Sequence, residues 1–320
     1  MKIALIRQRP SIGDCLLLAP LIRAIKERHP NSRLTVITDS SYIGGALPRI
    51  FEGIPGVDRI ECVASTEWTT EGNKVIDPIL RTANGDTPHA VKKADLIYDC
   101  NSAFMEFERQ YHGKTPCGIG EFWLRYHKYD TPTSNVLPVY QVSPEQEEAV
   151  SKWFEEFSIP TDKKLVGMVL RSGAACRDWD YNGKCASVAM WIHSANCYPI
   201  GIDPWKGLPS PYGCSCVGKP LDFVAALLKR CDAVLTPDTG LLHLAQAVGT
   251  PTVALWGILS PELRVKGYNT LVVPNTSLGV CSDNEAPYCP CCRWTFQQWS
   301  CMRRITLPMI TEALAKTLKK

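Results

Sequence analysis

The stretch 231-CDAVLTPDTGLLHLAQAVGTPTVALWG-257 predicts a strand, a turn, a helix and a second strand in immediate succession. The apolar runs 233–236 and 252–256 have the length of buried strands. Between them, Pro237 breaks the first run, and apolar residues then recur at helical spacing until Gly249 marks the helix end. The stretch therefore predicts a β-α-β unit whose turn lies at the carboxyl end of a strand, where open α/β sheets bind ligands.

The start of this helix is suited to a phosphate. Asp238 and Thr239 are residue types that favour the N-cap, and Gly240 follows them. A helix that begins there directs unpaired N–H groups and a partial positive charge toward the carboxyl edge of the sheet. Asp238 is expected to cap the helix and organise the loop while also contacting the ligand.

The pattern D-T-G-x-x-H-L-A-x-A-x-G-T-P-T-V-A-L-W-G resembles glycosyltransferase family 9, the heptosyltransferases of lipopolysaccharide synthesis. The resemblance implies an α/β protein with the GT-B fold, in which two Rossmann-like domains with parallel sheets face a central cleft. It also implies that Asp238, Thr239 and Gly240 hold the diphosphate of a nucleotide-sugar donor. His243, one turn further on, either touches that donor or has a structural role in the helix.

The amino-terminal residues predict a second doubly wound domain. A strand at 3–6 is followed by a helix from about 14 to 28, which Pro20 should bend or whose start it should displace. The loop Ser11-Ile12-Gly13-Asp14 resembles the family motif S-x-G-D, and the resemblance implies that Asp14 is the catalytic base. The alternative is that Asp14 only caps its helix. The resemblance also implies that Ser11 and Gly13 bind the acceptor, with Gly13 where the backbone comes close to the acceptor or donor sugar.

The resemblance to GT-B enzymes implies that the acceptor binds in this first domain, assigned to residues 1–140. Asn101, which follows a strand at 94–100, matches a family turn that faces the acceptor, although Ser102 replaces the usual glycine. Residues 104–130 are rich in aromatic and charged side chains. This segment either determines the acceptor or forms an amphipathic helix with ordinary aromatic packing.

The second domain is assigned to residues 141–302, after a proline-rich linker, and is expected to bind the donor. Its first strand, 165–170, ends in a turn where Ser172 and Arg177 match the hydroxyl and basic positions of the family, two residues before Trp179. Arginine grips a diphosphate through parallel hydrogen bonds. The alternative is a surface ion pair of Arg177 with Asp178 or Asp180. The resemblance also implies that a carboxylate near the end of the next strand contacts the nucleoside, which makes Asp203 a candidate for that role.

The carboxyl-terminal part contains a cysteine-rich segment, 281–301, and then residues 303–320. Four thiols, from Cys281, Cys289, Cys292 and Cys301, have the chemistry to hold structural zinc or iron, but their spacing is not a standard zinc pattern. Free thiols in a structured loop are the favoured interpretation. By the resemblance to GT-B proteins, the final helix, about 307–318, is expected to pack back on the first domain.

Composition limits the classes of function. The chain has 320 residues, 45% of them hydrophobic, and its net charge of +3 is too small to indicate a nucleic-acid partner. Residues 1–33 carry seven Lys/Arg against two Asp/Glu, so a basic surface for an anionic acceptor or membrane headgroups is an alternative to ordinary solvated helix faces. Fifteen scattered cysteines, a first apolar run of only four residues and the lack of any long apolar run favour a cytoplasmic protein, with peripheral membrane contact left open.

Together these features predict an inverting glycosyltransferase that moves a sugar, by the resemblance heptose from ADP-heptose, to a hydroxyl of a glycan or glycolipid such as lipopolysaccharide core. The reaction would need no cofactor besides the nucleotide-sugar co-substrate, because Arg177 and the helix start supply positive potential. The alternatives are a non-catalytic nucleotide-sugar-binding module and a family member that glycosylates a protein. The sequence does not indicate an oligomeric state.

Overall fold

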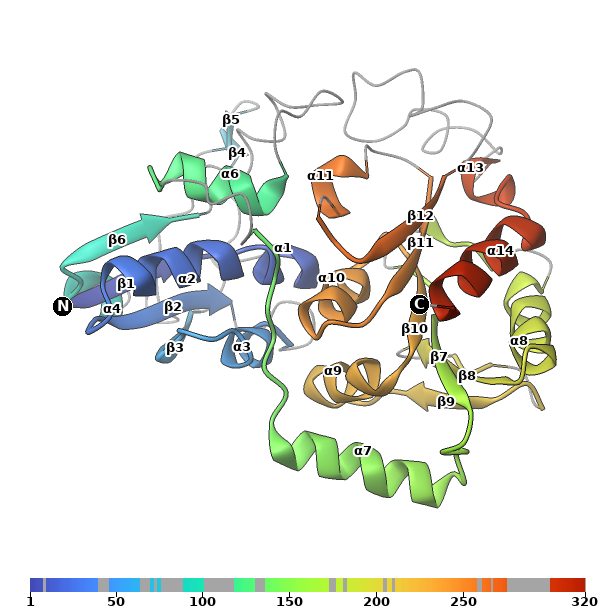
Figure 1. Cartoon of the computed structure of the whole chain (residues 1–320). Helices are drawn as coiled ribbons and strands as arrows, with labels where there is room; N and C mark the ends of the chain where they lie inside the picture. The colour runs from blue at the N-terminus through green and yellow to red at the C-terminus, as the bar shows by residue number, and fades with distance from the viewer. Residues whose placement is uncertain are drawn as a thin grey trace. The chain divides into compact units, whose positions relative to one another are not determined.

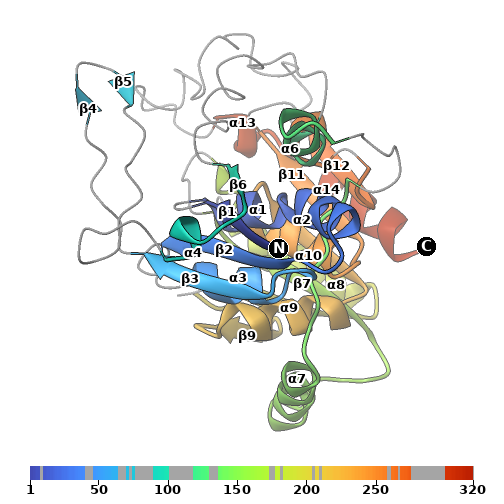
Figure 2. The same cartoon turned by 90° about the vertical axis from the view of Figure 1, so that its left-hand side faces the viewer.

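The computed structural model describes residues 1–7, 10–39, 46–63, 70–71, 74–75, 89–100, 118–129, 136–172, 177–180, 183–203, 206–208, 211–257, 261–265, 267–274 and 300–319. The chain forms two compact units that divide between Gln141 and Val142. This division lies one residue from the predicted boundary after residue 140. Figures 1 and 2 show the elements of each unit from two directions.

Unit 1 is built on a parallel sheet of four strands in the order β3-β2-β1-β6. The strands are β1 (Lys2–Ile6), β2 (Arg33–Asp39), β3 (Arg59–Val63) and β6 (Leu96–Asp99), and a separate antiparallel pair is formed by β4 (Thr70–Glu71) and β5 (Lys74–Val75). The helices are α1 (Ile12–Leu16), α2 (Ala19–Arg28), α3 (Ala46–Glu52), α4 (His89–Lys92) and α6 (Ile119–Tyr126).

Pro20 determines where the first long helix begins. The predicted single helix from about 14 to 28 is divided into α1 and α2, and Pro20 lies in the first turn of α2. A proline has no N–H to donate and fits this position, whereas further inside a helix it would remove a hydrogen bond. The expectation that Pro20 displaces the helix start is therefore confirmed.

Unit 2 contains a parallel sheet of six strands in the order β12-β11-β10-β7-β8-β9. The strands are β7 (Lys164–Val169), β8 (Cys197–Asp203), β9 (Cys214–Val217), β10 (Ala233–Pro237), β11 (Thr252–Trp256) and β12 (Thr270–Pro274). The helices are α7 (Pro144–Glu156), α8 (Lys184–Ser194), α9 (Leu221–Arg230), α10 (Gly240–Ala247), α11 (Glu262–Val265), α13 (Ser300–Arg303) and α14 (Leu307–Leu318).

The stretch 231–257 folds as the predicted β-α-β unit, β10-α10-β11. Every residue of β10 and β11 is buried, as expected for inner strands of a parallel sheet. Gly249 has a φ of +86°, a conformation that glycine adopts at low cost just after a helix end. Alternate residues of β11 face opposite layers: Val253 packs with α8 and α14, and Ala254 packs with α10 and α11.

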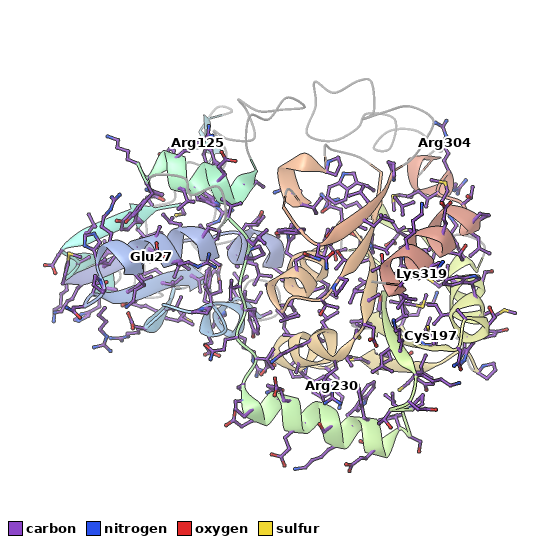
Figure 3. All side chains as sticks on the ribbon, viewed as in Figure 1. Glu27, Arg125, Cys197, Arg230, Arg304 and Lys319 are labelled. Carbon is purple, nitrogen blue, oxygen red and sulfur yellow. The ribbon has the colours of Figure 1, made fainter. Side chains whose placement is uncertain are left out.

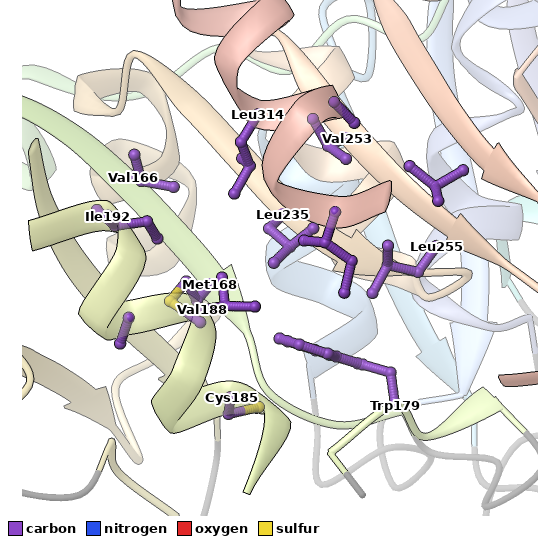
Figure 4. Close-up of a cluster of buried hydrophobic side chains, with 14 of the residues drawn as sticks. Val166, Met168, Trp179, Cys185, Val188, Ile192, Leu235, Val253, Leu255 and Leu314 are labelled. Atoms are coloured by element: carbon purple, nitrogen blue, oxygen red, sulfur yellow. The ribbon is translucent and has the colours of Figure 1, made fainter. Parts of the chain in front are cut away.

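The carboxyl-terminal helix α14 belongs to unit 2. Its buried face, Ile310, Ala313 and Leu314, shares one apolar cluster with strand residues such as Val166 and Val253 (Figure 4). This differs from the expectation that the helix packs on the first domain. The apolar stripe of a helix shows that it must be covered, but it does not identify the surface that covers it.

Helix α7 lies alongside α9 on the outside of unit 2 (Figures 1 and 2). Arg230, labelled in Figure 3, extends from the end of α9 so that its guanidinium lies 5.1 Å from the ring centre of Phe154 on α7. Its Nη1 also donates to Ser151 Oγ at 3.3 Å. In the part of the chain that the structure describes, no helix is both long and apolar enough to span a membrane.

Candidate functional site

The candidate donor site lies at the carboxyl ends of β7, β8 and β10 in unit 2. From β7 the chain proceeds outward through β8 and β9, and it then returns to the other side of β7 to form β10, β11 and β12. The order therefore reverses between β7 and β10, and ligands of doubly wound sheets bind at the carboxyl end of such a reversal. The predicted donor residues follow these three strands.

Thr239 caps helix α10 at this edge. Its backbone is extended, and its side-chain hydroxyl accepts a hydrogen bond from the N–H of Leu241 at 3.2 Å. Gly240 is the first helical residue. The predicted helix start at Thr239–Gly240 is confirmed, but the expectation that Asp238 caps the helix is wrong: Thr239 is the cap, and the Asp238 carboxylate, one residue earlier, pairs with Arg177. The first-turn amides and the helix dipole both favour an anion at this end.

Arg177 lies beside this helix start. Its Nη1 donates to the backbone carbonyl of Asp238 at 3.2 Å and lies 3.3 Å from Oδ2 of the same residue. Its Nε is buried and has no hydrogen-bond partner among the residues that the structure describes. The alternative pairs with Asp178 or Asp180 are not formed within the described ranges, so the cation is directed toward α10.

Trp179 holds the Arg177 turn against the sheet. Its ring is fully buried in the cluster shown in Figure 4, and its Nε1 donates to the carbonyl of Val169 at 2.9 Å. Because Val169 is the last residue of β7, this bond ties the turn to the strand end. The tryptophan of the motif therefore has a packing role that fixes the position of the arginine two residues earlier.

Ser172 and Asp178 close the same turn from its two ends. The N–H of Ser172 donates to Asp178 Oδ1 at 2.7 Å. Burial raises the pKa of the Asp178 carboxyl, although this hydrogen bond and the nearby Arg171 act in the opposite direction. Ser172 lies at the carboxyl end of β7, as predicted, and whether its hydroxyl contacts a donor stays a prediction.

Asp203 is engaged by protein groups. Arg171 donates to it through two parallel bonds, Nε to Oδ2 and Nη2 to Oδ1, both 2.9 Å long. The N–H of Lys206 donates to Oδ1 at 2.8 Å. The sequence prediction missed Arg171, although its place after β7, beside a strand that ends in a carboxylate, is a usable signal.

His243 lies on the inner face of α10. The residue is 4% exposed, and its Nδ1 is 3.0 Å from the hydroxyl of Tyr268, whose ring it meets edge to face. These contacts give the imidazole the structural role that was one of its two predicted alternatives. A contact of His243 with the donor stays a prediction.

Asp14 forms a capping box at the start of α1, in unit 1. The Asp14 N–H donates to Ser11 Oγ, and the Ser11 N–H donates to Asp14 Oδ2, both at 3.2 Å. The carboxylate therefore does take part in capping its helix, and it lies in the first turn of α1, the helix that follows β1 in the chain. Gly13 is buried within α1. Asn101 lies outside the described residues.

The predicted metal ligands are also outside the description. This holds for Cys281, Cys289 and Cys292, and for the side chain of Cys301. Within the described ranges, no group of three or more His, Cys, Asp or Glu side chains is arranged to hold a metal. Eight described cysteines are free thiols, and burial raises the pKa of several, including Cys100 and Cys185.

Comparison with known proteins identifies similar chains. Residues 218–285, which include α9, β10, α10 and β11, match the family described as glycosyltransferase family 9 (heptosyltransferase). The chain is 29% identical over 159 residues to lipooligosaccharide heptosyltransferase 2 of Haemophilus influenzae, and the match spans 43% of this chain but only 46% of that protein. It is 24% identical over 297 residues to lipopolysaccharide core heptosyltransferase OpsX of the same organism, covering 82% of this chain and 80% of that one.

A solved structure has a similar fold. The Escherichia coli ADP-heptose lps heptosyltransferase II is similar with a TM-score of 0.69 at 17% identity, over 100% of this chain and 99% of that chain. The predicted GT-B fold and the resemblance to the family are confirmed by these matches.

Proposed function

Because the chain is related to glycosyltransferase family 9, we propose that it transfers heptose from ADP-heptose to a hydroxyl of a lipopolysaccharide-core glycan. The proposal rests mainly on one structural observation. The segment that matches the family includes Asp238 and Thr239, and Arg177, from a different part of the chain, contacts Asp238, the residue before the helix cap Thr239. A cation and a helix start that meet at the carboxyl edge of a sheet suit the diphosphate of a nucleotide-sugar.

The proposed reaction divides the chemistry between two groups. Arg177 and the first-turn amides of α10 stabilise the negative charge of the leaving diphosphate. Asp14 accepts the proton of the acceptor hydroxyl, and the oxygen attacks the anomeric carbon from the face opposite the leaving group. One base and one direct displacement predict inversion of configuration. The protein itself supplies the positive charge, so metal at the cysteine-rich segment would have a structural role.

A second candidate function is nucleotide-sugar binding without transfer. The capping box favours it, because Asp14 already has a use in the fold that requires no catalysis. Both candidates predict donor binding in unit 2, and they differ in whether the wild type transfers the sugar and in whether that transfer depends on the Asp14 carboxylate. Donor binding is therefore the first property to test.

Calorimetric titration with ADP, UDP, GDP and ADP-heptose tests the donor site. The wild type should bind one of these nucleotides, and Arg177→Ala should raise its Kd by roughly ten- to hundredfold, because hydrogen bonds to charged groups are strong. Arg230→Ala is the matched control. It removes the same side chain from the same unit, but Arg230 precedes the start of β10, whereas Asp238 follows its end.

The two variants separate a local effect from a general one. If the wild type binds no nucleotide at millimolar concentration, the donor site is wrong. If Arg230→Ala weakens binding as much as Arg177→Ala does, net charge explains the loss and the assignment of Arg177 fails.

A further inference from the structure

In the ion pair of Arg171 and Asp203, the carboxylate is far more buried than the guanidinium. The Asp203 side chain is 1% exposed, whereas that of Arg171 is 38% exposed. Both carboxylate oxygens of Asp203 accept hydrogen bonds, one of them from two donors. The carboxylate is therefore fully engaged, and it fixes the plane of a guanidinium that reaches solvent.

Such an arrangement is not explained by stability alone. Removing a carboxylate from water costs free energy that an ion pair often fails to recover, and apolar side chains of similar volume frequently stabilise a fold more. A bidentate pair does hold the arginine in one orientation, which lowers the entropy lost when a ligand binds to it. The pair has the features of a preorganised binding group.

Its position identifies the part of the ligand that it would meet. In doubly wound sheets that bind dinucleotides, a carboxylate at the end of the second strand accepts a hydrogen bond from the ribose. Asp203 is the last residue of β8, the second strand outward from the reversal. Here the guanidinium of Arg171 covers the Asp203 carboxylate. The group exposed to a ligand therefore donates hydrogen bonds, whereas the carboxylate of a dinucleotide-binding sheet accepts one.

The phosphate end of the site lies on the other side of β7. Arg177 contacts Asp238, which follows β10, whereas Arg171 contacts Asp203, which ends β8. β8 and β10 are separated by β7, a distance of roughly 10 Å for two strand spacings. The two arginines therefore occupy different ends of the candidate donor site.

We propose that Arg171 binds the nucleoside of the donor through acceptor atoms of its ribose or base, and that Asp203 is a positioning residue for Arg171. This inference rests on the proposed function and names a residue for its specificity. It replaces the predicted contact between Asp203 and the nucleoside. A guanidinium donates only, so the recognised atoms are ribose oxygens or the carbonyl oxygens and ring nitrogens of a base.

Two probes separate the ends of the site: ADP, and inorganic pyrophosphate, which has no nucleoside. Calorimetry on Arg171→Lys, which keeps the charge but loses the planar fork, should show a roughly ten- to hundredfold rise in the Kd of ADP. The Kd of pyrophosphate should stay at the wild-type value. Arg177→Ala should weaken both ligands, and Asp203→Asn should repeat the selective loss of Arg171→Lys.

Replacing one partner alone leaves a buried charge, so a double variant guards against misfolding. Arg171→Leu with Asp203→Leu removes both charges, and thermal unfolding confirms that it folds. It should also bind pyrophosphate normally and ADP weakly. A wild type that binds both probes while the Arg171 variants lose both equally, or lose neither, would overturn the inference but leave the phosphate site intact. A wild type that binds neither probe overturns the proposed function and the inference with it.

Discussion

Substitution of Asp14 by asparagine separates catalysis from helix capping. In the structure Asp14 Oδ2 accepts the Ser11 N–H at 3.2 Å, and an amide oxygen can accept the same bond. From the helix start, the fold therefore loses the favourable interaction with a negative charge, about 0.3–1 kcal/mol. If Asp14 is the general base, kcat falls by about 10²–10⁴, equivalent to roughly 3–5 kcal/mol of barrier.

The complementary variant, Ser11→Ala, removes the cap and keeps the carboxylate. The N–H of Asp14 loses its acceptor, Ser11 Oγ, which should cost about 0.5–2 kcal/mol of unfolding free energy. Its loss of kcat should be far smaller than that of Asp14→Asn. Ser143→Ala is the remote control: it deletes a similar cap, at the start of α7, and should lower stability while leaving transfer unchanged.

The assay follows ADP release from ADP-heptose in the presence of acceptor, with unfolding in urea measured on the same samples. The prediction is a crossed result, in which Asp14→Asn is stable and inactive and Ser11→Ala is less stable and active. Retention of kcat within about tenfold by Asp14→Asn would refute the base assignment. The transfer would then depend on a base other than Asp14, whereas a wild type that releases no ADP in the presence of acceptor would favour the non-catalytic binding protein.

Three further predictions concern stability. Burial lowers the pKa of His127 to about 4, below its usual 6.5, so the imidazole should not titrate by NMR above pH 6. The contribution of neutral His127 to the unfolding free energy should be complete above pH 6.5 and fall toward pH 4, and His127→Gln should flatten that decline. An NMR titration midpoint near 6.5 would contradict the burial. Lys184 Nζ donates to the Ile305 carbonyl at 2.8 Å, so Lys184→Met should cost about 1–3 kcal/mol and speed amide exchange in α14, while the exposed control Lys316→Met should do neither. Gly213 and Gly249 both have positive φ, +140° and +86°, but a Cβ at Gly213 would overlap the Pro199 carbonyl oxygen, whereas the space at Gly249 is open. Gly213→Ala should therefore lower the unfolding midpoint in urea more than Gly249→Ala does. Equal losses would show that backbone strain alone, and not the overlap, determines the cost.

Local features of the sequence predicted local structure well. The strand–helix–strand at 231–257, the interruption at Pro20 and the start of α10 at Gly240 each depend on residues that are close in sequence. Turn residues, caps and apolar spacing act within a few positions, so one sequence contains the needed information. The same reasoning placed Arg177 and Trp179 at the end of β7.

Partners that are distant in sequence were harder to predict. The apolar face of α14 is complementary to many buried surfaces, and the choice of unit 2 depends on the space between α8 and β11. Arg171 and Asp203 are 32 positions apart and meet only because β7 and β8 are neighbours. The sequence alone does not distinguish an aspartate at a strand end that contacts a ligand from one that pairs with an arginine.

The two arginines of the candidate site differ in how firmly each is held, and this difference suits different roles. Arg171 donates through two atoms at 2.9 Å to a carboxylate whose side chain is 1% exposed. Arg177 makes a longer contact, 3.3 Å, with a carboxylate that is 11% exposed, and its buried Nε has no partner within the described residues. A bidentate pair with a buried carboxylate resists exchange, whereas a pair held through one longer contact yields to a stronger anion. Under the proposed function, the diphosphate therefore displaces Asp238 from Arg177, while Arg171 keeps Asp203 and offers the nucleoside a fixed surface.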